Sequence, residues 1–241
     1  MHLKRLAAPR SWKLARKEAK FATKPSPGPH PTRHSIPLML VLREILGYAK
    51  TAREAKIVFN ERRVIVDGRV RTNPKFPVGL MDVIEIPVLK KAWVVLLDKS
   101  GKFTLAAIPK SRAKEKLCRI VNKTIVRGGH LQLNLHDGRN ILVKIKDPKS
   151  PKEDKYKTRD TLIYDFAKNR IKGIIPFTVG SLALVTGGTH RGNIAKIESR
   201  RILRSPQPNI VVLANDKGRF ETIENYVFMV GEKKAMVPEV G

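Results

Sequence analysis

Cysteine is nearly absent from this chain, because Cys118 is the only one. A single thiol cannot close an internal disulfide, and it cannot supply the paired cysteines of a structural zinc site. The six histidines are scattered and show no metal-ligand spacing. We therefore expect no metal site, no cofactor and a reducing, cytoplasmic environment.

Long apolar runs are also missing. No stretch approaches the roughly 18 uncharged residues that a membrane-spanning helix requires. The basic start of the chain is not followed by the apolar segment of a secretory signal, so we expect no such leader. Apolar residues still make up 41% of the sequence. That share is enough for folded cores, and the length predicts one to three domains without a membrane partner.

Acidic residues are the third scarcity. The chain has 21 Asp and Glu against 49 Lys and Arg, a formal net charge of +28. An excess of one sign opposes compaction through self-repulsion unless a polyanion neutralises it. Nucleic acid is the polyanion that Lys and Arg bind by displacing counterions. The composition therefore predicts a protein that binds RNA or DNA.

Catalytic constellations are missing as well. The sequence contains no Gly-x-Ser-x-Gly elbow, and its histidines form no metalloprotease-type pair. The glycines at 187, 188 and 192 lack the Lys-Ser/Thr pair and following helix of a phosphate-binding loop. Asp67 lies before Gly68, where hairpin geometry already explains it. We predict that the chain is not an enzyme and has no small-molecule substrate.

Residues 1–37 are predicted to be a basic, RNA-threading tail. They contain nine Lys and Arg and a single acid, Glu18. Residues 12–20 could form a short helix, and the alternating prolines from Pro25 to Pro31 favour an extended chain. Trp12 could stack on an unpaired base or fill an apolar gap. Deletion of this segment is expected to weaken assembly and leave the rest folded.

Residues 38–88 are predicted to form a small module of helices and strands. Apolar spacing indicates a helix from Leu38 that stops at Gly47. Thr51-x-x-Glu54 is a capping box that opens a second helix to about Phe59. Residues 64–70 predict a hairpin with an Asp-Gly turn, and 83–86 a third strand. This pattern resembles the S-four RNA-binding domain, a fold of αL type in which the basic face of the two helices and the loop leading to the hairpin bind RNA.

Residues 89–172 are predicted to form a central β-rich domain. Strands are expected at 93–97, 131–135 and 141–145, the last two joined by an Asp-Gly turn. Residues 113–121 could form a short helix. The charged, Pro-containing and Ser-containing stretch 146–160 is expected to be an exposed loop.

Residues 173–241 are predicted to form a small barrel and a C-terminal segment. The stretch 180–197 reads as strand, glycine-rich turn and strand, and further strands are expected at 210–213 and 220–223. The stretch resembles a KOW motif in an SH3-like barrel. Gly192 matches the key glycine of that motif, where the chain needs a positive φ. His190 and Arg191 would lie at the loop tip.

The order of these parts resembles the S-four-e family of archaeal and eukaryotic small-subunit ribosomal proteins, and the compact C-terminal part favours the archaeal form over the eukaryotic one. The opening, from His2 to Trp12, and the segment Gly28-Pro29-His30 carry much of this resemblance. It implies an α+β, mostly β, multi-domain fold and a structural role in the small ribosomal subunit. The implied partners are small-subunit rRNA and neighbouring ribosomal proteins. The alternatives are an RNA-modifying enzyme like a pseudouridine synthase and a KOW transcription factor.

Basic side chains of the tail, the S-four-type module and the KOW-type loop, together with Trp12, are the predicted RNA contacts. They are Lys4, Arg5, Arg10, Trp12, Lys13, Arg16, Lys17, Lys20, Lys24, Arg33, Arg43, Lys50, Arg53, Lys56, Arg62, Arg63, Arg69, Arg71, Lys75, His190 and Arg191.

Overall fold

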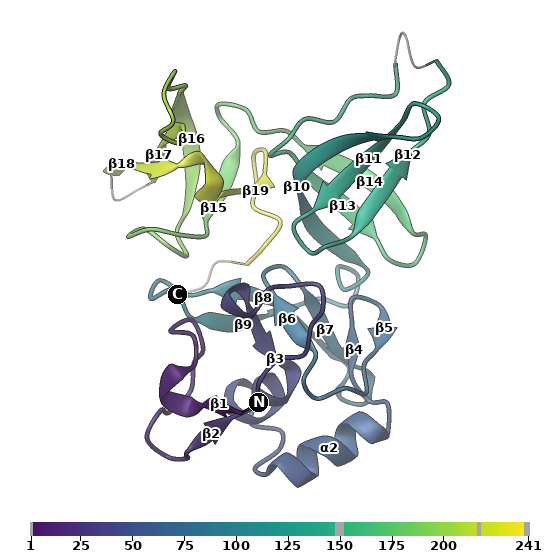
Figure 1. Cartoon of the computed structure of the whole chain (residues 1–241), viewed down its shortest axis with the longest axis vertical. Coiled ribbons are helices and arrows are strands. Elements are labelled where there is room, and N and C mark those ends of the chain that lie inside the picture. Colours follow the sequence, from purple (N-terminus) through teal and green to yellow (C-terminus); the bar gives the residue numbers. More distant parts are fainter. Residues whose placement is uncertain (1, 148–151, 216–217, 239–241) are drawn as a thin grey trace. The chain divides into compact units, whose positions relative to one another are not determined.

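A computed structural model describes residues 2–147, 152–215 and 218–238 of the chain (Figure 1). The described chain forms two compact units. The first contains the residues up to Lys116 together with Phe166–Lys168, and the second contains most of the remainder. Among the described residues, no helix is long and apolar enough to cross a membrane.

Within the described residues, both α-helices belong to the first unit. α1 (Leu38–Leu40) continues directly into a π-helical turn, η3 (Val41–Ile45). The chain leaves this element at Gly47, whose φ of 67° is the left-handed conformation expected of a helix stop. The predicted helix from Leu38 to Gly47 is therefore present, although its second half is π-helical.

The predicted capping box opens α2 (Ala52–Asn60). The Thr51 hydroxyl accepts a hydrogen bond from the Glu54 backbone N–H at 3.2 Å, and the Glu54 carboxylate accepts one from the Lys50 N–H at 2.9 Å. These bonds satisfy donors that a helix start leaves without intrahelical partners. Ala55 and Phe59 of α2 are buried and belong to the core of the first unit.

A five-stranded antiparallel sheet packs with these helices in the order β5-β4-β7-β8-β9. β4 (Ile65–Val66) and β5 (Arg69–Val70) form the predicted hairpin. Asp67 and Gly68 both have positive φ, as the tight turn requires. The other three strands are β7 (Val83–Ile86), β8 (Lys91–Leu97) and β9 (Phe103–Ile108).

The sheet crosses the predicted domain boundary at residue 88. β7 pairs with β8, so strands from both sides of that boundary share one set of hydrogen bonds. Val83 lies opposite Val94, and Ile84 lies opposite Trp93. The buried alternate residues of β8 complete the core of the first unit, which explains why the compact unit extends to Lys116.

Residues 2–37 fold onto the first unit. β1 (Leu3–Lys4) pairs with β2 (Phe21–Ala22), and β3 (Ser35–Pro37) pairs with β6 (Pro77–Gly79). The predicted helix at 12–20 is absent, since the chain turns there without helical hydrogen bonds. Apolar residues of this segment, including Trp12, belong to the core of the unit. The prediction of an extended tail is therefore corrected, because residues 2–37 are part of the folded first unit.

The second unit is built from two five-stranded sheets. The first has the order β12-β11-β10-β13-β14. Its strands are β10 (Glu115–Val126), β11 (His130–Leu135), β12 (Asn140–Val143), β13 (Thr161–Asp165) and β14 (Arg170–Ile175). The predicted helix at 113–121 is wrong, because those residues enter the long strand β10. Consecutive residues Lys116, Leu117 and Cys118 are all buried, a pattern that a strand covered on both faces produces.

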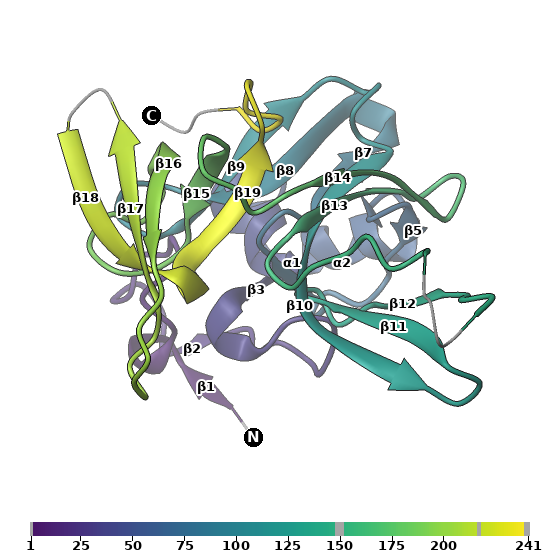
Figure 2. The same ribbon diagram turned by 90° about the horizontal axis from the view of Figure 1, so that it is seen from above.

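The second sheet has the order β18-β17-β16-β15-β19. Its strands are β15 (Leu182–Val185), β16 (Ile194–Arg201), β17 (Ile210–Asn215), β18 (Gly218–Ile223) and β19 (Val227–Gly231). Figure 2 shows β16, β17 and β18 side by side, as the register requires. Gly192 has a φ of 75°, which confirms the predicted positive φ in the β15–β16 turn.

The predicted loop at 146–160 lies partly outside the described residues. In its described part, Lys157 donates its backbone N–H to the Asp160 carboxylate at 3.0 Å, and strand β13 begins one residue later. Residues 152–158 are exposed or half-buried and contain no helix or strand, as predicted.

Candidate nucleic-acid interface

Arg5 anchors the N-terminal segment from inside the first unit. Its side chain is 4% exposed, and its Nη2 lies 3.4 Å from a carboxylate oxygen of Glu18 and 3.4 Å from one of Glu44. Its Nε also donates to the backbone carbonyl of Ala15. A guanidinium held inside in this way cannot reach phosphate, so the prediction of Arg5 as an RNA contact is corrected.

Trp12 is the second anchor. Its side chain is almost completely buried, and the indole Nε1 donates to the Ser35 carbonyl at 2.6 Å. A buried indole normally finds such a partner for its N–H. The two alternatives for Trp12 are thereby decided in favour of the apolar gap, and its prediction as a base-stacking contact is corrected.

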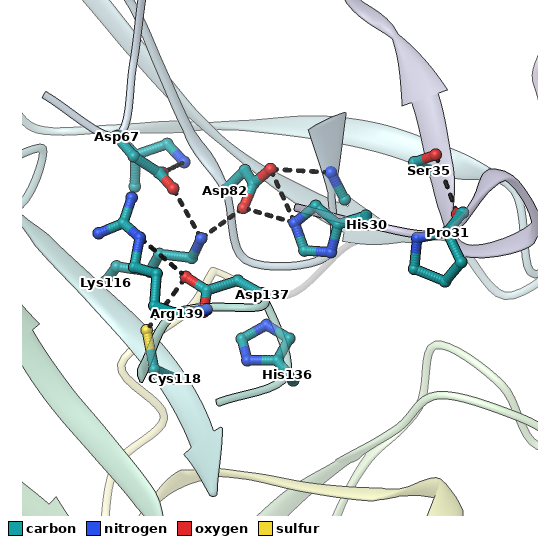
Figure 3. A network of polar contacts seen from close by, with 12 residues as sticks. His30, Pro31, Ser35, Asp67, Asp82, Lys116, Cys118, His136, Asp137 and Arg139 are labelled. Atoms are coloured by element: carbon teal, nitrogen blue, oxygen red, sulfur yellow. Dashed lines mark hydrogen bonds and ion pairs between the residues drawn. The ribbon is translucent and has the colours of Figure 1, made fainter. Parts of the chain in front are cut away.

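A buried network of four charged or titratable groups forms the third anchor (Figure 3). The Lys116 ammonium donates to Asp67 at 2.7 Å and also donates to Asp82. His30 Nε2 lies 3.0 Å from the Asp82 carboxylate. The N-terminal segment, the hairpin turn and the start of β10 are thus held by one set of contacts. The sequence gives no local signal of this group, because its members are up to 86 residues apart.

Asp82 is ionised in this network. Burial alone would raise the pKa of its carboxyl, but the Lys116 ammonium and His30 outweigh burial and hold that pKa well below its ordinary value. Its second carboxylate oxygen accepts the Gly79 N–H at 2.9 Å, which also favours the charged form. The network therefore satisfies its buried charges internally, as a stable buried ion pair must.

The remaining cations of the N-terminal segment face solvent. Seven of the predicted contacts are exposed: Lys4, Arg10, Lys13, Lys17, Lys20, Lys24 and Arg33. Arg16 is half-buried, and it donates to the carbonyls of Leu6, Ala8 and Pro9 at 2.9–3.0 Å. Arg16 thus holds the preceding turn in place, and the seven exposed side chains form the basic surface of this segment.

The S-four-type module presents a second basic surface. Seven of its predicted contacts are exposed or half-buried on α2 and around the hairpin: Lys50, Arg53, Lys56, Arg62, Arg69, Arg71 and Lys75. Arg71 lies over the Phe76 ring at 4.2 Å from its centroid. Arg43 and Arg63 form ion pairs with the adjacent acids Glu44 and Glu61, at 2.9 and 2.8 Å. The structure thus brings most of these cations to one compact unit.

His190 and Arg191 lie in the β15–β16 turn of the second unit. The His190 ring stacks on Phe220 with centroids 4.3 Å apart. Arg191 Nε donates to the Gly188 carbonyl at 2.8 Å. Both side chains are exposed, so the loop tip remains accessible to a partner.

One group of ligand-type atoms occurs near the β11–β12 turn. Those of Cys118, His136 and Asp137 lie within 4.8 Å of one another. Arg139 pairs with the Asp137 carboxylate at 3.3 Å, and His136 Nδ1 accepts the Arg119 N–H at 3.2 Å. These contacts give the group a structural role in the turn.

Three matches to family models follow one another within the first 171 residues. They are the RS4NT (NUC023) domain at residues 1–33, the S4 domain at 36–84 and the ribosomal family S4e at 89–171. The S4 match falls on the helices and hairpin that carry the second basic surface. The fold and its cations thus define an RNA-binding protein.

Curated relatives match nearly the whole chain. Small ribosomal subunit protein eS4 of Methanocaldococcus jannaschii is 50% identical over 238 residues, covering 98% of this chain and 96% of the relative. The protein of the same name from Staphylothermus marinus is 47% identical over 237 residues, covering 98% and 94%. The crystal structure of ribosomal protein S4e from Thermoplasma acidophilum has a TM-score of 0.70 at 30% identity, covering 85% of this chain and 99% of that chain.

The chain belongs to the eS4 family of small ribosomal subunit proteins. This membership confirms the resemblance to the S-four-e family and its archaeal relatives. It makes the chain a ribosomal protein of the small subunit and excludes the two alternatives, an RNA-modifying enzyme and a transcription factor.

Proposed function

We propose that the chain stabilises folded small-subunit rRNA by neutralising its backbone along two basic surfaces of the first unit. One surface is the exposed face of residues 2–37, and the other is the S4 module. Folded RNA is recognised mostly through its backbone and shape, because side chains cannot read its deep major groove. Lys and Arg serve this purpose by displacing counterions from phosphate.

The sorting of cations in the N-terminal segment is the single observation that supports this proposal best. Arg5 is buried with carboxylate and carbonyl partners, whereas seven other cations of the segment face solvent. The exposed set has only Glu18 as a local acid. A free protein gains no stability from such a surface, and a phosphate backbone supplies its missing counter-charges.

We infer that the second unit adds a smaller contact through its last sheet. The strand-turn-strand of β15 and β16, with positive φ at Gly192, supports a KOW-type motif in an SH3-like barrel. His190 and Arg191 are exposed residues of its loop.

Neighbouring ribosomal proteins are further proposed partners. Exposed apolar residues of the first unit, such as Val88 and Leu89, 63% and 42% exposed, support such a contact.

Sedimentation tests this function. The full chain, added to cells as a tagged copy, should travel with small ribosomal subunits in a sucrose gradient and dissociate progressively as the salt of the wash is raised. Recovery of rRNA with the tagged chain supports the proposal. Migration away from small subunits at low salt would overturn it.

A further inference from the structure

A cavity lies between the N-terminal segment and the end of the first helical element. Its volume is about 470 Å³, and its lining comes from residues 18–21, residues 43–50 and Arg5. Ala19, Gly47 and Ala49 are small, which leaves the space open; a Cβ built on Gly47 would meet no atom within 4 Å. Such a volume accommodates one nucleoside with its phosphate, whereas a protein side chain would fill only part of it.

Two carboxylates line this cavity in a strongly basic protein. Glu44 is 19% exposed and is held by Arg43, with its Oε1 2.9 Å from Arg43 Nη2. Glu18 is 69% exposed, and the only ion pair that it forms among the described residues is the 3.4 Å contact with Arg5. Charge-assisted hydrogen bonds are normally about 2.7–2.9 Å long, so this contact is weak. Because an ionised carboxylate has about four acceptor positions, Glu18 keeps capacity for a ligand.

An aromatic ring stands beside the carboxylates. The Phe21 side chain on β2 is 47% exposed and lines the cavity. The Lys20 ammonium lies 5.6 Å from its ring centroid. Exposed aromatic rings flanked by cations are the platforms on which proteins stack unpaired bases.

The carboxylates, cations and aromatic ring of the cavity together limit which ligand can bind there. A phosphate alone would be repelled by the two carboxylates, and an apolar peptide would offer no donor to Glu18 and no acceptor to the exposed Lys50 at the rim. The ligand should therefore offer a flat aromatic face, N–H donors and a negative group together. A nucleotide has all three.

The geometry points to a pocket for one unpaired guanine nucleotide of the bound RNA, a step that rests on the proposed function. The base stacks on Phe21, and the phosphate reaches Lys50 at the rim. The Glu18 carboxylate accepts the N1–H and the N2 amino group. Guanine is favoured because its Watson–Crick edge carries two parallel donors, which match the two oxygens of one carboxylate. Unpaired bases are commonly read by such stacking and edge contacts.

Binding of short RNAs to the full chain tests the pocket. The probes are fluorescein-labelled pentanucleotides of uridine with guanine, inosine or adenine at the centre, followed by anisotropy at low salt. Guanine should bind about tenfold more tightly than adenine, with inosine between them because it lacks the N2 amino group. Uridine stacks weakly, so differences in affinity among the three probes come from the central base.

Two variants separate the edge contact from the stack. Glu18→Gln should abolish the preference for guanine over adenine, because the amide offers one acceptor and one donor in place of two acceptors. Adenine affinity should not fall, since Arg5 keeps its ion pair with Glu44. Phe21→Ala should weaken guanine binding about tenfold, as loss of a stacked base requires. Glu232→Gln and Ile125→Ala are matched controls in the second unit, where the exposed side chains lie outside the cavity. Circular dichroism verifies that each variant is folded.

The outcomes distinguish the pocket from the function. Equal affinity for the three probes, or a guanine preference that survives Glu18→Gln, would overturn the pocket while tight, salt-sensitive rRNA binding still supports the proposed function. Loss of rRNA binding by the unmodified chain would overturn the function itself.

Discussion

Residues 2–37 and the S4 module after them present similar basic surfaces but are held together by different contacts. The module has its own capped helix, tight hairpin and sheet, all made from residues close in sequence. The N-terminal segment has strands of only two or three residues and depends on Arg5, Trp12 and the His30–Asp82 contact. A segment that looks like a free tail by composition can thus be ordered by a few side chains with distant partners.

Deletion of residues 1–37 should reduce the stability of the first unit more than any of the single substitutions below. The truncated chain lacks the buried indole, the Arg5 ion pairs and the His30 contact at once. We expect a decrease of more than roughly 5 kcal/mol in the free energy of unfolding of the first unit. Urea unfolding followed by tryptophan fluorescence of Trp93 would measure it.

A control variant keeps the anchors and neutralises three of the exposed cations. Replacement of Lys13, Lys17 and Lys20 by Gln should change the free energy of unfolding by less than about 0.5 kcal/mol per site. If the deletion and this triple variant had the same stability as the full chain, the segment would be a free tail after all.

Trp12→Ala should have the next largest effect. Removal of a fully buried large aromatic side chain costs about 4 kcal/mol, and it also leaves the Ser35 carbonyl without its donor. Thermal unfolding of the full chain by circular dichroism gives the value. Trp12→Phe keeps most of the volume and should be destabilised less than half as much; equal destabilisation of the two variants would show that packing is not the cause.

Lys116→Met should cost about 3 kcal/mol at neutral pH, because Asp67 and Asp82 stay buried without their cation. The pKa of Asp82 is lowered in the folded protein, so its ionised form adds stability above pH ~4 that disappears as pH falls. In the variant, the buried Asp82 anion lacks the Lys116 ammonium and destabilises the fold. Protonation of Asp82 removes this charge and raises the stability of the variant. The stability difference should therefore shrink between about pH 5 and pH 3. A pH-independent difference would argue against the network.

Thr51→Ala should have the smallest effect of the set, about 1 kcal/mol, because it removes only the side-chain cap of α2. The change is measured by urea unfolding against Thr51→Ser, which keeps the hydroxyl and should be nearly neutral. Equal destabilisation in the two variants would show that the hydroxyl does not act as the cap.

Local signals in the sequence predicted the S4 module well. Thr51 and Glu54, the Asp67-Gly68 turn and Gly192 each act through residues within a few positions, so their patterns can be read directly. The comparison with known families agrees with the predicted order of parts over the first 171 residues.

Features that depend on distant partners were not visible. Residues 113–121 were predicted as a short helix, but the chain from Glu115 onward forms β10, whose pairing with β11 begins at Ile120 and Leu135. Arg5 and Trp12 were predicted as RNA contacts. Their burial depends on Glu44 and Ser35, which are distant in sequence. The cavity beside Phe21 could not be found either, because its lining comes from two separate stretches.

The salt dependence of rRNA affinity tests the central claim most directly. A plot of log affinity against log salt for the full chain and small-subunit rRNA should have a steep negative slope. Replacement of the exposed Lys13 and Lys17 by Gln should reduce that slope by about one unit for each phosphate that the variant no longer neutralises. A flat plot, or a slope that these substitutions leave unchanged, would contradict the account.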